Sequence, residues 1–263
     1  MDVREFLGLQ PTHNPNRWFL PIELGICGGS GSLYGGCGLA AAIVAMEAAA
    51  ERPLVWANCQ YLAHARPPAI MDLDVTLAVV GNAATQARVI GRVGDQEVLH
   101  AHGTLGQREL PLSGAWIGMP DVAPPADCKP RSMPHHIPGT LSSRLEQRVA
   151  EGEGLHLDID DGRSALWCRL RDGSGWTLSA ATLGILGDFV PSGVGLALGE
   201  LTAGASLDNT IRVANLVETE WVLCDIRVDA VANGFGHGMV YLWAEDGSLL
   251  AMASQSIMVK LRD

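Results

Sequence analysis

The sequence predicts an α+β protein built from two similar units, in each of which one helix is followed by a run of antiparallel strands. The first observation is a cluster of prolines: seven of the fourteen lie between residues 111 and 138, where they favour an extended linker. The second observation is a faint internal repeat with an offset of 151 residues, which aligns Asp95 with Asp246 in two similar turns. We therefore expect an N-terminal unit at 1–112, a linker at 113–140 and a C-terminal unit at 141–263.

One helix and four strands are expected in the first unit. A glycine-rich run at 28–38 leads into the alanine-rich segment Leu39–Ala50, whose composition favours a helix. Stretches rich in apolar and β-branched residues then predict strands at Leu54–Leu62, Met71–Val80, Ala83–Val93 and Glu97–Gly106.

The second unit repeats this order. A helix is expected at Thr177–Phe189, where apolar residues recur at helical spacing and form one stripe. The strands are expected at Arg163–Arg171, Ala203–Val213, Trp221–Ala230, Gly236–Ala244 and Leu249–Val259. Because a striped helix needs a sheet to cover it, we expect each sheet to wrap its helix. The two sheets can also pair edge to edge within the chain, which removes an exposed strand edge from each.

Composition excludes several classes of function. The chain carries 29 acidic and 18 basic residues, a formal net charge of −11, so it lacks the basic face that binds nucleic acid. No window reaches the ~20 apolar residues of a membrane helix, and the charged N-terminus does not lead into a secretion signal. The six cysteines have no CxxC spacing, and His135-His136 has no acidic or cysteine neighbours at ligand spacing. We expect a cytoplasmic protein with reduced thiols, no metal and no other cofactor.

Several short motifs resemble one known family. In the first unit, Tyr34-Gly35-Gly36 precedes the alanine-rich helix, and Gln60-Tyr61-Leu62 ends a strand before Pro67. The motifs of the second unit are Leu186-Gly187-Asp188-Phe189, Ser206-Leu207-Asp208-Asn209, Glu220-Trp221-Val222-Leu223, Asp246–Ala251 and Ser254-Gln255-Ser256. In this order and spacing they resemble the TesB-like type II acyl-CoA thioesterases over most of the chain.

The resemblance implies a double hotdog fold, in which two antiparallel sheets each wrap around a central helix. It implies a homo-oligomeric enzyme of fatty acid metabolism that hydrolyses acyl-CoA to free acid and coenzyme A. In this family pattern Asp188 activates a water that Ser206 and Gln255 also hold. Four residues depart from the pattern, which usually has Gln, Thr, His and Glu at the positions of Cys37, Ser206, Asn209 and Ser256. Of these, Ser206 keeps the hydroxyl group.

The residues themselves leave alternatives at this site. Helical spacing places Asp188 on or beside the apolar stripe, where a carboxylate needs a partner or a function, although it could instead cap a turn at the helix end. Ser206 and Asp208 share one strand face, which leaves Asp208 as an alternative base. Gln255 lies in an apolar strand, either as a satisfied core amide or as part of the site.

Glu47 is the symmetry-related rival of Asp188. It lies in the first predicted helix, close to its inward face. At the 151-residue offset, however, the two polar partners of Asp188 are replaced by Val55 and Thr104. We therefore predict one hydrolytic site per chain, in the second unit. The alternative for Glu47 is a solvated position at the helix edge.

Other chemistries fit less well. The glycine-rich run 28–36 could hold a phosphate at a helix N-terminus, but it matches neither a dinucleotide fingerprint nor a P-loop, so we prefer a flexible turn. The sequence has no GxSxG motif, which disfavours a serine hydrolase. Two alternatives remain: a catalytically silent hotdog protein that binds acyl thioesters or mediates assembly, and a hotdog hydratase. The usual Asp and His pair of the hydratase is absent.

Overall fold

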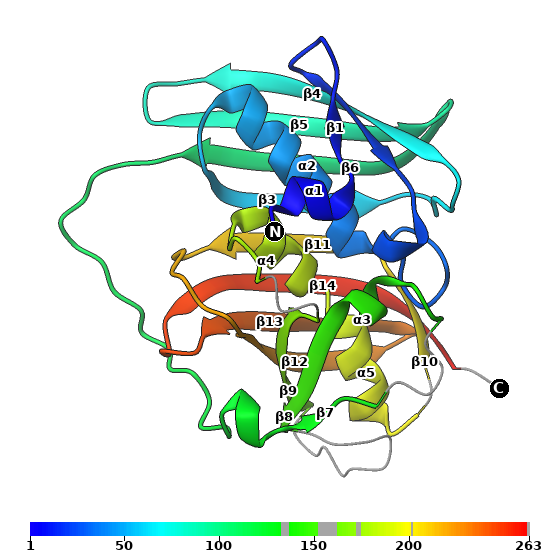
Figure 1. Cartoon of the computed structure of the whole chain (residues 1–263), viewed down its shortest axis with the longest axis vertical. Helices are drawn as coiled ribbons and strands as arrows, with labels where there is room; N and C mark the ends of the chain where they lie inside the picture. The colour runs from blue at the N-terminus through cyan, green and yellow to red at the C-terminus, as the bar shows by residue number, and fades with distance from the viewer. Residues whose placement is uncertain (133–136, 152–161, 172–174, 201, 262–263) are drawn as a thin grey trace.

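The computed structural model describes residues 1–132, 137–151, 162–171, 175–200 and 202–261 (Figure 1). Within these ranges, fourteen strands form one antiparallel sheet that runs through both halves of the chain. Thirteen strands follow the order β1-β2-β4-β5-β6-β3-β11-β14-β13-β12-β9-β8-β7, and β10 pairs with β14. The α+β class and the double hotdog architecture are confirmed.

In the first half, a long helix crosses the face of the sheet. This helix, α2 (Gly35–Ala50), packs on β3, β4, β5 and β6, and ten of its residues are buried. It begins at Gly35, four residues before the predicted start. The other elements of this half are α1 (Val3–Leu7), β1 (Gln10–Pro11), β2 (Arg17–Pro21), the short 3-10 helix Leu24–Ile26, β3 (Leu54–Tyr61), β4 (Ile70–Val80), β5 (Ala84–Val93) and β6 (Gln96–Gly106).

The second half is built similarly but has a divided helix. Its helices are α3 (Leu141–Arg144), α4 (Ala180–Leu186), α5 (Val190–Leu198) and the 3-10 turn Pro125–Asp127. Its strands are β7 (Lys129–Pro130), β8 (Leu145–Glu151), β9 (Arg163–Leu170), β10 (Thr202–Ser206), β11 (Asp208–Val213), β12 (Val222–Ala232), β13 (Phe235–Ala244) and β14 (Leu249–Leu261). The strand predictions are confirmed within a few residues, except that the strand expected at 203–213 is two strands, separated at Leu207.

The single helix predicted at 177–189 is wrong. The structure ends α4 at Leu186 and starts α5 at Val190, with Gly187 at the end of the first helix. Pro191 explains the new start, because proline has no N–H and fits the first turn of a helix but not its interior. The break leaves Asp188 between two helices, where its side chain is free to turn into the interior.

The apolar stretch Ala180–Leu198 is long enough, by length and composition alone, to cross a membrane. In the fold it contains the break between α4 and α5, and 72% of its most apolar window is buried inside the protein. The stretch is therefore part of the protein core. All six cysteines are also buried and unpaired, as their spacing predicts.

Two contacts between secondary-structure elements form the centre of the seam between the halves. Strand β3 pairs antiparallel with β11, with Cys59 opposite Asn209, so the two sheets meet edge to edge as expected. Beneath this seam α2 packs against α4 (Figure 1). A Cβ added at Gly36 would lie only 2.8 Å from the carbonyl oxygen of Ile185, so the two helices touch backbone to backbone.

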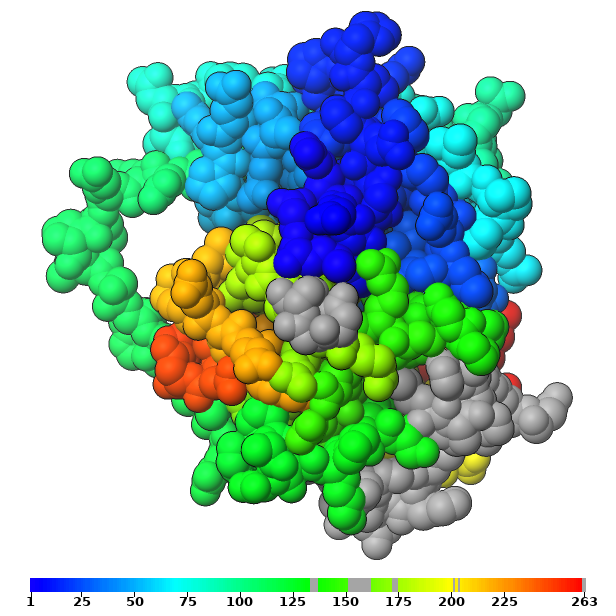
Figure 2. Space-filling model, in the orientation of Figure 1, coloured from blue at the N-terminus to red at the C-terminus, as the bar shows by residue number. Residues whose placement is uncertain are grey.

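Between the halves, the chain crosses outside the body of the protein. Residues 107–124 contain no helix or strand, and they stand out as a separate arm in the space-filling view (Figure 2). Trp116 in this arm is 92% exposed. The later part of the expected linker behaves differently, because β7 pairs with β8 at the edge of the sheet.

Candidate active site

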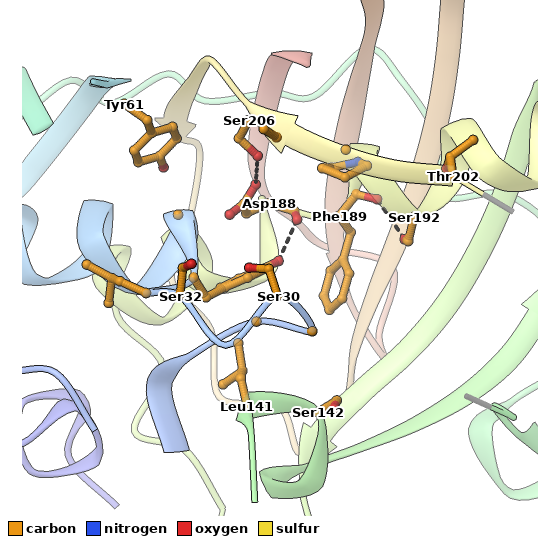
Figure 3. A pocket seen from close by; sticks show the side chains of 18 of the residues that line it. Ser30, Ser32, Tyr61, Leu141, Ser142, Asp188, Phe189, Ser192, Thr202 and Ser206 are labelled. Carbon is orange, nitrogen blue, oxygen red and sulfur yellow. Dashed lines mark hydrogen bonds between the residues drawn. The ribbon is translucent and has the colours of Figure 1, made fainter. Parts of the chain in front are cut away.

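A cavity of about 920 Å³ lies between the two halves, and Asp188 lines it (Figure 3). The first half contributes the turn before α2, the first residues of α2 and the end of β3. The second half contributes the break between α4 and α5, strand β10, and parts of β7, β8 and β9. The cavity is therefore completed only when the halves are docked.

The structure brings the three predicted site residues together. The Asp188 side chain is 2% exposed, and its Oδ1 accepts hydrogen bonds from the Ser206 hydroxyl at 3.1 Å and from the Gln255 amide Nε2. The same Nε2 lies 3.2 Å from the Ser206 Oγ. A buried carboxylate, a hydroxyl and an amide thus form one hydrogen-bonded group at the cavity wall.

The helix break also fixes the orientation of the Gln255 amide. Its Oε1 accepts the backbone N–H of Val190 at 3.2 Å, one of the N–H groups at the start of α5 that has no partner within the helix. Because the amide oxygen is held there, the NH₂ group must face Asp188 and Ser206. The break between α4 and α5 therefore has two effects. It turns Asp188 towards the cavity, and it directs the Gln255 NH₂ group at the Asp188 carboxylate.

Asp188 also receives a hydrogen bond from the other half of the protein. Its Oδ2 accepts the backbone N–H of Gly36 at 2.6 Å, in the first turn of α2. The N-cap residue of α2, Tyr34, makes no side-chain capping bond to the helix, and its hydroxyl instead donates to the Asp188 carbonyl oxygen. Asp188 thus serves as the capping acceptor of a helix about 150 residues away, where the helix dipole favours a negative charge.

These contacts determine the pKa of Asp188. Burial raises the pKa from 3.8 to about 6, because it disfavours the charged carboxylate. The hydrogen bonds from Gln255, Gly36 and Ser206 act in the opposite direction, since they stabilise the ionised form. The result is a carboxylate that is mostly ionised at neutral pH yet more basic than an exposed aspartate, as a general base requires.

Tyr61 is a site residue that the sequence did not identify as functional. It ends β3, and its hydroxyl points towards Asp188 (Figure 3). This hydroxyl is buried, and no described residue forms a normal hydrogen bond with it; the weakly polar Cys59 thiol is its neighbour. Tyr61 appeared in the sequence only as part of a family motif, which gave no indication that its side chain faces the carboxylate.

Gly35 packs directly against Tyr61 and Asp188. A Cβ at this position would lie 2.7 Å from Asp188 Oδ2 and 3.0 Å from the Tyr61 hydroxyl. A side chain at Gly35 would therefore collide with both groups, so a glycine is needed where α2 begins. The start of α2 thus lies against the Asp188 carboxylate, an acceptor, and the Tyr61 hydroxyl, a donor.

The alternatives for the base do not join this group. Asp208 accepts the backbone N–H of Ser256 at 2.8 Å and so holds β11 against β14. Glu47 is half-buried and accepts the backbone N–H of Leu54 at 2.8 Å, which ties the end of α2 to the start of β3. Each carboxylate therefore accepts a backbone N–H, and neither is bonded to the Ser206 or Gln255 side chain.

The remaining sequence candidates have other surroundings. Cys37 and Asn209 are fully buried, and no described residue forms a hydrogen bond with the Asn209 amide. The glycine-rich run forms a turn at the cavity wall, where Ser32 Oγ accepts a hydrogen bond from Arg66. Within the described ranges, no three His, Cys, Asp or Glu side chains gather as metal ligands. His135 and His136 lie outside the described residues.

Comparisons with known proteins agree with this geometry. The sequence profile of the acyl-CoA thioesterase C-terminal domain matches residues 125–259. The solved structure of a protein assigned as a thioesterase, from Novosphingobium aromaticivorans, is 31% identical and has a TM-score of 0.88, covering 96% of this chain and 98% of its own. No curated protein sequence gives a significant match.

More distant structures share the fold. A hot dog protein of unknown function from Alicyclobacillus acidocaldarius is 18% identical, with a TM-score of 0.85 over 99% of this chain and 98% of its own. The acyl-CoA thioesterase II of Mycobacterium marinum is 16% identical, with a TM-score of 0.77 over 99% of each chain.

Proposed function

Because this chain belongs to the TesB-like acyl-CoA thioesterase family, we propose that it hydrolyses acyl-CoA to free acid and coenzyme A with Asp188 as the general base. The observation that carries this proposal is the hydrogen-bonded group of Asp188, Ser206 and Gln255 at the wall of a large cavity. A carboxylate with a pKa of about 6 can accept a proton from water at neutral pH.

The proton is taken by Oδ2 of Asp188. A carboxylate has about four acceptor positions, and three are filled: two on Oδ1, by Ser206 and Gln255, and one on Oδ2, by Gly36. The fourth, on Oδ2, is left for a water that enters from the cavity, which Asp188 lines. Ser206 and Gln255 were expected to hold the water itself; in this proposal they act as positioning residues that hold the base.

The water then attacks the thioester carbonyl carbon while its proton moves to Asp188. Negative charge develops on the carbonyl oxygen, and the Tyr61 hydroxyl is the donor that meets it. The N–H of Gly36 is already bonded to Asp188, so of the first N–H groups of α2 only that of Gly35 is left as a second donor. Collapse of the tetrahedral intermediate breaks the C–S bond, and coenzyme A leaves as a thiolate that takes up the proton held by Asp188, which restores the ionised base.

A thiol-release assay separates hydrolysis from silent binding. The purified chain is incubated with acyl-CoA esters of several chain lengths, and free thiol is measured over time beside calorimetric binding of the same esters. Hydrolysis predicts thiol release that the Asp188→Asn variant lacks. Binding of acyl-CoA without any release by the unmodified chain would instead identify a catalytically silent acyl-thioester-binding protein.

A further inference from the structure

The cavity holds a second charged group that the proposed hydrolysis does not use, the guanidinium of Arg131. This residue follows β7 directly, and its backbone N–H donates to the Gln147 carbonyl oxygen at 2.8 Å. Its side chain returns to the same residue, because Nη1 donates to Gln147 Oε1 at 2.8 Å. Gln147 is 5% exposed and lines the cavity together with Arg131.

Arg131 has no acidic partner among the described residues. Two carboxylates line the cavity, those of Asp188 and Glu200, and neither forms an ion pair with Arg131. Burial lowers the pKa of Arg131. The groups that raise this pKa are Cys168, Tyr34 and Cys224, and no carboxylate is among them. An arginine stays charged in proteins, and Arg131 is half-buried, where a charge without a counter-ion is unfavourable.

Apart from Gln147, the cavity wall on β8 and β9 is apolar, which limits what can pair with Arg131. Leu145 and Leu166, which are 1% and 2% exposed, line the cavity beside it, as does Val149. These side chains come from β8 and β9, whereas Asp188 is bonded to residues of β10 and β14. The wall suits an alkyl chain, and the guanidinium suits an anionic group at its end.

We propose that Arg131 and Gln147 bind a carboxylate at the far end of the acyl chain, so that the substrates are coenzyme A thioesters of dicarboxylic acids. This inference rests on the proposed function, because the thioester end must lie at Asp188. A guanidinium can also bind a coenzyme A phosphate, which has the same anionic oxygen chemistry. The buried apolar wall favours the carboxylate, since coenzyme A phosphates are strongly hydrated.

The test compares matched pairs of substrates, each an acyl-CoA with a terminal carboxylate and one of equal length with a terminal methyl group. The unmodified chain should have the higher kcat/KM for the carboxylate member of at least one pair. Arg131→Gln should lower that value roughly 10- to 100-fold, the loss of one charge-assisted contact, and leave the methyl member unchanged. Arg88→Gln, which removes an exposed positive charge from β5, is the control and should change neither.

Three further measurements make the outcome decisive. If Arg131→Gln weakens both members of each pair, and the loss disappears with dephospho-coenzyme A thioesters, Arg131 binds a phosphate and the carboxylate assignment is wrong. Arg131→Lys keeps the charge and should retain part of the preference, which guards against a misfolded glutamine variant.

Calorimetric binding of free dicarboxylic and monocarboxylic acids needs no turnover. A preference for the diacid that depends on Arg131 would therefore support the site even if hydrolysis failed, and equal binding would overturn it.

Discussion

Glu47 lies late in the central helix of the first half and Asp188 just after α4 in the second half, and their surroundings differ. Asp188 is almost fully buried and accepts three hydrogen bonds, from a hydroxyl, an amide and a helix N-terminus. Glu47 is half-buried and accepts the N–H of Leu54. Burial raises the pKa of both groups, but only Asp188 faces the large cavity.

The cause of the difference is the continuity of the helix. The helix of the first half runs unbroken from Gly35 to Ala50, so Glu47 stays on a helical surface and reaches the neighbouring strand. The helix of the second half stops before Asp188 and restarts at Val190. Asp188 therefore lies outside a regular helix, and its side chain can turn towards the cavity. Glu47 therefore holds the end of a helix to a strand, whereas Asp188 is a candidate general base.

The strongest test of this comparison replaces each carboxylate by its amide. Asp188→Asn should lower kcat/KM by roughly 10²–10⁴, because the amide cannot accept the proton from water. Glu47→Gln should leave kcat/KM within a few-fold, since the glutamine oxygen can still accept the Leu54 N–H. Circular dichroism first shows that each variant is folded. Thiol release by the two variants then shows which carboxylate the reaction needs. The reverse order of effects would move the active site to the first half.

A second test concerns the tyrosine that the first half contributes to the site. Tyr61→Phe should lower kcat by roughly 10²-fold and change KM little, because a lost oxyanion donor affects the transition state more than the bound substrate. Tyr241→Phe, on β13, removes a hydroxyl outside the cavity lining and is the matched control. If both variants keep normal turnover, Tyr61 is not the oxyanion donor.

The pH dependence of activity provides a third test. The ionised form of Asp188 is the base, so kcat/KM should rise with pH through a midpoint of about 6. From pH 7 down to pH 5 it should fall about tenfold, as the carboxylate becomes protonated. Glu47→Gln should show the same midpoint as the unmodified chain. A midpoint that moves in this variant would show that Glu47 takes part in the reaction.

The smallest effects are expected from the two positioning residues. Ser206→Ala and Gln255→Ala should each lower kcat/KM severalfold at high pH. Each should also shift the pH midpoint above 6, because the hydrogen bonds that these residues donate lower the pKa of Asp188. Thr104→Ala, at the position related to Gln255 by the repeat, should do neither. An unchanged midpoint in both site variants would contradict their role in holding the base.

The sequence was most informative where side chains follow a local pattern. The strands Met71–Val80 and Ala83–Val93 were predicted within one residue. Their buried and exposed side chains alternate along the sequence, and this alternation is a local signal of a strand. The helix break was missed although Pro191 marks it, because the apolar stripe continues across it. Asp188, Ser206 and Gln255 could be named together only through family motifs.

Other features of the site have no local signal. The bond between Gly36 and Asp188 joins residues 152 positions apart, and no periodic pattern reports such a contact. Arg131 lies in a stretch that its prolines marked as a linker, and its position in the cavity depends on the pairing of β7 with β8. The first feature follows from how the two halves dock, and the second from strand pairing within the second half.

The close approach of α2 to α4 has a consequence for how such a chain can change over evolution. At Gly36 the halves meet through main-chain atoms, and the N–H that reaches Asp188 belongs to the backbone. Any substitution at Gly36 would place a Cβ against the main chain of α4 and disturb the contact between the halves. Side chains elsewhere in the first half can change more freely, as long as its backbone still brings this N–H to Asp188.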